Sequence, residues 1–203
     1  MDADNYLMRD IVQASVDVSG QGQGQKAPAW LYFSMLVAAI GGGWTAVAIA
    51  ILPALGTGAS VWLLLFFVAP FSEEALKPLG VYFIFLRWPH VVLSRIQIAL
   101  LAAAGGLTFA FVESWLYLDA YPDEGNDFVV FRFTAPIAMH VVSSFVLGLG
   151  LTPNIFGQLW RGPVPASTRQ AYFSAVGIHA AYNITVLLLA IVGARELVEQ
   201  TGR

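Results

Sequence analysis

The chain has 203 residues and a formal net charge of −3, with 58% hydrophobic residues, 11% charged residues and no cysteine. Soluble domains carry about 25% charged residues, so this composition predicts a polytopic membrane protein. The missing cysteines exclude disulfides, thiolate metal ligands and a thiol nucleophile. The sequence has no visible basic patch of the kind that binds nucleic acid, so we expect no partner of that class.

Residues 1–29 form a polar segment that ends in alternating glycine and glutamine over residues 20–25, a composition typical of a flexible linker. The segment lacks the basic start and the apolar core of a signal peptide. It is compatible either with a short helix on the membrane surface or with a disordered tail. The residues that recur at helical spacing in it are Leu7, Ile11, Ala14 and Val18.

Five apolar runs follow that are long enough to cross a hydrocarbon core, which takes about 20 residues. They cover approximately residues 30–55, 61–86, 97–118, 131–152 and 170–193. We therefore expect an all-α polytopic bundle of about five transmembrane helices. We expect this bundle to form a single transmembrane domain over residues 30–193, followed by a short tail, 194–203. Glycines in the first, third and fourth runs predict close helix packing.

The distribution of charge between the runs predicts the orientation of the protein. The loops around residues 87–95 and 161–169 carry basic residues, whereas the loop from Asp119 to Asp127 is acidic. Because Lys and Arg collect in cytoplasmic loops, we expect the first two loops inside and the third outside. The amino terminus is then cytoplasmic and the carboxyl terminus external.

The second run contains two carboxylates and an ammonium, Glu73, Glu74 and Lys77. A charge at mid-membrane costs roughly 2.5–3.5 kcal/mol, so the group requires partners, water or a metal and is a candidate functional site. Glu73 and Lys77 are spaced to pair on one helix face, which leaves Glu74 free for chemistry. Pro70 and Pro78 flank the group and predict a kinked or broken helix. The alternative is a structural ion pair that joins two helices.

The later spans carry Glu113, His140, His179 and Asn183. At about 1.5 Å per residue, Glu113 and the two histidines reach depths similar to that of Glu74, so we expect these groups to converge. His179 and Asn183 share a helix face, where Asn183 can orient the imidazole or donate to an oxyanion. Taken singly, either histidine is equally well explained as a hydrogen-bonded packing residue.

These residue types suit a hydrolytic zinc site. Imidazole and carboxylate are zinc ligands where no thiolate exists, and catalytic zinc keeps three protein ligands and one open position. His140 and His179 would complete such a set with either Glu113 or Glu73. Glu74 would then be the general base that takes a proton from the attacking water.

Four ordered motifs resemble those of the PrsW family of intramembrane proteases, which is related to the CAAX prenyl endopeptidases. They are Glu73-Glu74-Ala75-Leu76-Lys77, Phe109-Ala110-Phe111-Val112-Glu113, His140 and His179-Ala180-Ala181-Tyr182-Asn183. The resemblance covers about residues 61–190. It implies an intramembrane endopeptidase of a prokaryotic plasma membrane that cleaves a membrane-embedded protein, such as a single-span substrate. The site residues are then expected to be catalytic Glu73, Glu74 and Asn183, metal-binding Glu113, His140 and His179, and supporting Lys77.

Three alternatives use the same residues. Glutamate and histidine can activate water without a metal, as has been argued for the prenyl endopeptidase relatives. The polar cluster can instead be the core of a non-catalytic membrane scaffold subunit, as in the related scaffold subunit of gamma-secretase. A proton or ion relay in a small transporter is disfavoured, because the five runs show no pair of repeats of the kind many transporters have.

Overall fold

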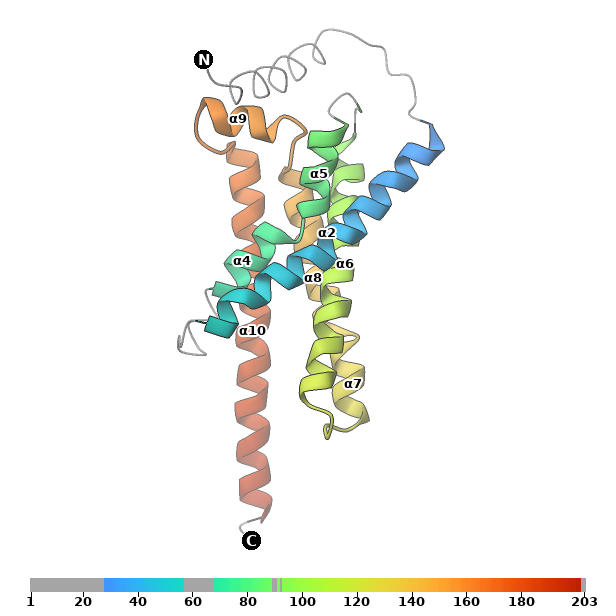
Figure 1. The fold of residues 1–203 in the computed structure, drawn as a ribbon. Helices are drawn as coiled ribbons and strands as arrows, with labels where there is room; N and C mark the ends of the chain where they lie inside the picture. Colours follow the sequence, from blue (N-terminus) through green and yellow to red (C-terminus); the bar gives the residue numbers. More distant parts are fainter. Residues whose placement is uncertain (1–27, 57–67, 89–90, 92, 202–203) are drawn as a thin grey trace.

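The computed structural model describes residues 28–56, 68–88, 91 and 93–201, and every regular element in these ranges is a helix (Figure 1). The helices are α2 (Ala29–Gly56), α4 (Ala69–Leu76), α5 (Leu79–Arg87), α6 (Arg95–Ala120), α7 (Asn126–Arg132), α8 (Ala135–Gly150), α9 (Ile155–Arg161) and α10 (Ala166–Thr201). The predicted all-α bundle is confirmed. Most of the predicted linker and surface helix, residues 1–27, lies outside the described ranges.

Four helical stretches of the described chain are long and apolar enough to cross a membrane: Ala29–Ala50, Arg95–Ala120, Asn126–Gly150 and Ala166–Gly193. They correspond to the first, third, fourth and fifth predicted spans. The protein is therefore an integral membrane protein. The second predicted span corresponds to the short helices α4 and α5, and its first residues, 61–67, are outside the described ranges.

The second span is broken where the prolines predict it. Helix α4 ends at Leu76, and α5 begins at Leu79 with Pro78 as its N-cap residue. Proline has no N–H to donate, and its ring clashes with the carbonyl one turn earlier, so a regular helix does not continue through it. The two helices consequently run in different directions, with α4 turned toward α10 (Figure 1).

A second break lies in the fourth span. Helix α7 ends at Arg132, the backbone turns at Phe133 and Thr134, and α8 starts at Ala135 with Pro136 in its first turn. Proline suits this position because the first N–H groups of a helix have no intrahelical partner. The break separates Arg132 from the helix that carries His140.

The bundle is centred on α6 and α8, which lie side by side, while α10 packs along α8 and α2 crosses α5 and α6 (Figure 1). Glycine allows the crossing of α2 and α5, because a Cβ atom added at Gly42 would collide with the backbone of Gly80. The close packing predicted from glycine is confirmed there. The neighbouring Gly41 makes no such contact, since its added Cβ would meet nothing within 4 Å.

Candidate active site

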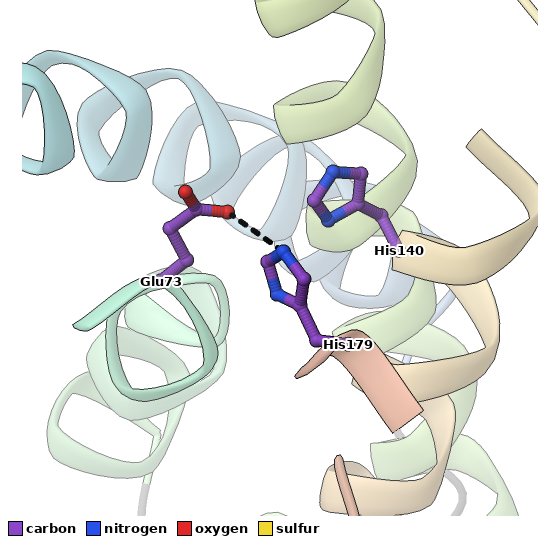
Figure 2. Close-up of side chains that lie close together, drawn as sticks. All are labelled: Glu73, His140 and His179. Carbon is purple, nitrogen blue, oxygen red and sulfur yellow. Dashed lines mark ion pairs between the residues drawn. The ribbon is translucent and has the colours of Figure 1, made fainter. Parts of the chain in front are cut away.

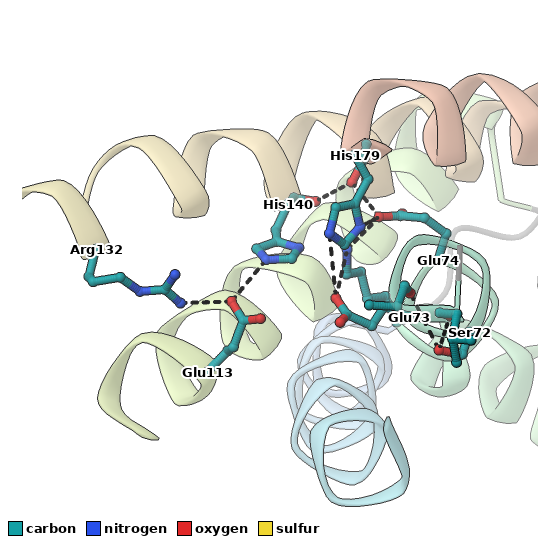
Figure 3. Close-up of polar contacts among 11 residues, drawn as sticks. Ser72, Glu73, Glu74, Glu113, Arg132, His140 and His179 are labelled. Atoms are coloured by element: carbon teal, nitrogen blue, oxygen red, sulfur yellow. Dashed lines mark hydrogen bonds and ion pairs between the residues drawn. The ribbon is translucent and has the colours of Figure 1, made fainter. Parts of the chain in front are cut away.

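Glu74 is the most connected carboxylate of the predicted site. It is fully buried, and its Oε1 atom lies 2.5 Å from Nζ of Lys77, 2.9 Å from Nδ1 of His179 and 3.0 Å from Oγ of Ser143. Ser143 belongs to α8 and His179 to α10, so this one oxygen joins three segments of the bundle (Figure 3). The break after α4 makes this junction, because it turns the start of the second span toward α8 and α10.

The predicted pairing of Lys77 needs correction. Its Nζ atom lies 4.0 Å from Glu73 but only 2.5 Å from Glu74, so Glu74 is not left free. The Glu74 side chain is 0% exposed and that of Glu73 is 11% exposed, so Glu74 has the greater need of a cation to replace water. Helix geometry permits the contact between Lys77 and Glu74, because residues three apart lie on one helix face, as residues four apart do. Lys77 also lies 5.1 Å from the centroid of the Phe109 ring, a cation–π contact.

A second carboxylate contacts the other histidine. Oε2 of Glu113, on α6, lies 3.2 Å from Nε2 of His140 and accepts a hydrogen bond of 2.9 Å from Nη2 of Arg132 (Figure 3). Because an ionised carboxylate has only acceptor oxygens, His140 donates to it through Nε2–H. This assignment directs the Nδ1 lone pair of His140 away from Glu113.

Glu73, His140 and His179 lie close together, and we call these three residues the central group (Figure 2). One possible ligand atom from each lies within 4.8 Å of the others, and all three residues are buried. His179 Nε2 lies 3.8 Å from Oε2 of Glu73, and the two imidazole centroids are 5.1 Å apart. The structure thus brings Glu73, rather than Glu113, into the group with both histidines.

The chemistry of this group fits a zinc ion. Among the described residues, Oε2 of Glu73 and Nδ1 of His140 are buried without a hydrogen-bond partner. Buried polar atoms are nearly always paired, so these two atoms, beside a third ligand nitrogen, could hold a cation. Two imidazoles and one carboxylate are also a ligand set of catalytic zinc. The predicted zinc site therefore fits the residues present.

Asn183 lies one turn after His179 on α10 and is half-buried. It shares the helix face of His179, as the sequence predicts. Its expected part in the chemistry stays a prediction.

Arg132 and Ser143 belong to the network but were not predicted from the sequence. Arg132 is 8% exposed and lies just inside the predicted fourth span, so a cation within an apolar run was the signal for it. Ser143 has no comparable signal, because serine is common at packed helix interfaces in membranes.

The fold and the site together define an integral membrane protein with a buried group of carboxylates and imidazoles that could hold a metal ion. The chain belongs to the PrsW family of intramembrane metalloproteases, whose family model matches residues 26–198. The protein is accordingly an intramembrane protease. No curated protein and no solved structure matches it.

Proposed function

We propose that this protease is a zinc-dependent endopeptidase that cleaves a membrane-embedded protein, such as a single-span substrate, within or beside the bilayer. The observation that carries the proposal is the meeting of Glu73, His140 and His179 from three helices, with two buried ligand atoms that have no hydrogen-bond partner among the described residues. In this assignment Glu73 Oε2, His140 Nδ1 and His179 Nε2 bind the metal. Glu113 supports His140 in place of acting as the third ligand.

Zinc, when bound, supplies Lewis-acid chemistry and makes water acidic enough to ionise near neutral pH. Glu74 is the base that accepts the proton of the attacking water. Its Oε1 atom is occupied by three hydrogen-bond partners, whereas its Oε2 atom is buried and has none in the described part of the chain. We therefore assign the proton to Oε2, from which it passes to the nitrogen of the departing amine.

The other polar residues hold this arrangement. Lys77 balances the charge of Glu74, whose side chain is fully buried. Asn183 is assigned to the oxygen of the substrate carbonyl, where a fixed donor stabilises developing negative charge. An amide suits that position because it donates without adding a charge to the membrane interior.

The test is the zinc affinity of the full chain in detergent, measured by competition with a chelator of known affinity. We expect about one zinc per chain in the wild type, as three ligands converge on one position. A folded His140→Ala/His179→Ala variant should bind none. An Asp119→Ala/Asp123→Ala variant, changed at two exposed loop-side carboxylates, is the matched control and should bind zinc normally.

The same measurement separates this proposal from the alternatives. A wild type that binds no zinc at saturating concentration contradicts the metal centre. Cleavage of membrane proteins that persists in chelator would then support a metal-free glutamate mechanism. The absence of any cleavage by the zinc-bound wild type would instead favour a scaffold role.

A further inference from the structure

Arg132 is a buried cation that the proposed chemistry does not use. Its guanidinium donates to Oε2 of Glu113 at 2.9 Å, and His140 Nε2 lies 3.2 Å from the same oxygen (Figure 3). One carboxylate oxygen therefore contacts both a fixed cation and a histidine of the central group. Glu113 thus connects Arg132 to the histidine of that group.

The surroundings of Arg132 fix it in place. Its guanidinium carbon lies 3.9 Å from the centroid of the Tyr117 ring, and its carbonyl oxygen accepts a hydrogen bond of 2.7 Å from Oγ of Ser114. Both contacts come from α6, the helix that also carries Glu113. Because α7 ends at Arg132, the residue is held by α6 and not by continuation of its own helix. Arg132 is thus held against α6, and its guanidinium donates to Glu113.

The arrangement has a counterpart on the other side of the central group. His179 contacts Glu74, which pairs with Lys77, just as His140 contacts Glu113, which pairs with Arg132. Each histidine thus has a carboxylate behind it, and each carboxylate has its own cation. A carboxylate behind a metal-binding histidine sets its tautomer and ring orientation, and losing such a partner typically weakens metal binding by about 10–100-fold.

We propose that Arg132 is a positioning residue that holds the Glu113 carboxylate against His140. His140 then keeps its Nε2–H tautomer and presents Nδ1 to the other two residues of the central group, Glu73 and His179. The metal-binding part of this inference rests on the proposed zinc site. The tautomer part does not, because it concerns the protein without metal. Arginine suits the task because its planar guanidinium can stack on Tyr117 while donating to a carboxylate.

The test compares wild type with Arg132→Lys, which keeps the charge but not the stacked planar donor, and with Arg132→Gln. Arg87→Gln changes an exposed arginine at the end of α5 and is the matched control. The first readout is the ¹⁵N NMR spectrum of His140 in metal-free protein at about pH 8, where an ordinary imidazole is neutral. We expect one Nε2–H form in wild type and Arg87→Gln, and a mixture of tautomers in both Arg132 variants.

The second readout is zinc affinity by chelator competition. We expect about a 10–100-fold loss in Arg132→Gln and a smaller loss in Arg132→Lys. A single Nε2–H tautomer in Arg132→Lys, with zinc affinity equal to that of wild type, would overturn the positioning role even if Arg132→Gln fails to fold. If wild type binds no zinc but Arg132→Lys still mixes the tautomers, the zinc proposal fails and the positioning of His140 by Arg132 stands.

Discussion

Nδ1 of His179 lies 2.9 Å from Oε1 of Glu74, and this contact determines which edge of the imidazole is available. The Glu74 carboxylate can only accept, so His179 donates through Nδ1–H and keeps a lone pair on Nε2. That nitrogen faces Glu73 at 3.8 Å. The neighbouring glutamates thus approach different nitrogens of His179: Glu74 contacts Nδ1, and Glu73 faces Nε2.

Substitution of Glu73 and substitution of Glu74 should have different effects on zinc binding and on cleavage. Loss of a residue that only supports a metal ligand typically lowers metal affinity by about 10–100-fold. We expect Glu73→Gln to lower zinc affinity by more than this, because it removes a ligand. Glu74→Gln should still bind zinc at saturating concentration but cleave at least about 100-fold more slowly, as expected for loss of a general base. Chelator competition and cleavage of a membrane-protein substrate measure the two effects, with Glu124→Gln in an exposed loop as control. Full cleavage by Glu74→Gln would refute its role as base.

Lys77 should be essential for stability. It is fully buried, and its ammonium is the close partner of Glu74. Breaking a buried ion pair from one side costs about 3–5 kcal/mol, because an unpaired charge remains. We expect this loss in the unfolding free energy of Lys77→Met in mixed micelles. The double variant Lys77→Met/Glu74→Gln should recover part of it, and the exposed Arg95→Met should change little. A double variant less stable than Lys77→Met would argue against the pair.

Ser143 and Ser144 offer a matched comparison. Both are fully buried on α8, but Oγ of Ser143 contacts Glu74 at 3.0 Å, whereas Oγ of Ser144 has no hydrogen-bond partner among the described residues. Hydrogen bonds inside membrane proteins contribute about 0.6 kcal/mol on average and up to about 1.7 kcal/mol. We expect Ser143→Ala to destabilise by this amount and to slow cleavage. Ser144→Ala should be neutral or slightly stabilising, since it removes an unpaired polar atom. Equal effects of the two changes on cleavage would contradict the role of Ser143.

Gly42 should tolerate no side chain. A Cβ atom there collides with the backbone of Gly80, which cannot move aside as a flexible side chain could. Overpacking of this kind costs about 1–3 kcal/mol, so Gly42→Ala should lower the unfolding temperature. Gly41→Ala, one residue earlier on the same helix, should be neutral or stabilising because its Cβ meets open space. A Gly42→Ala protein as stable as Gly41→Ala would mean that α2 and α5 do not cross there.

The sequence by itself determined the class of the protein and the approximate positions of its four long apolar helical stretches. Long apolar runs predict membrane helices because lipid offers no hydrogen-bond partner for backbone polar groups. A helix satisfies these groups within the run itself, so the prediction depends only on local sequence. The break at Pro78 follows from proline chemistry in the same local way. Glu73, Glu74 and Lys77 could be identified from the sequence, because a charged residue within an apolar run is costly and the sequence alone shows where such residues lie.

Only the tertiary structure decided which of these groups contact one another. The rotation of each helix about its axis and the angle at the α4–α5 break are set by packing against other helices, which residue spacing does not contain. For this reason spacing predicted Lys77 beside Glu73, whereas the more deeply buried Glu74 is its close partner. The pairing of Glu113 with Arg132, and of Ser143 with Glu74, likewise joins residues far apart in the chain. Burial makes an unpaired charge costly, so each buried charge pairs with an opposite one, and only the folded bundle defines which partner is nearest.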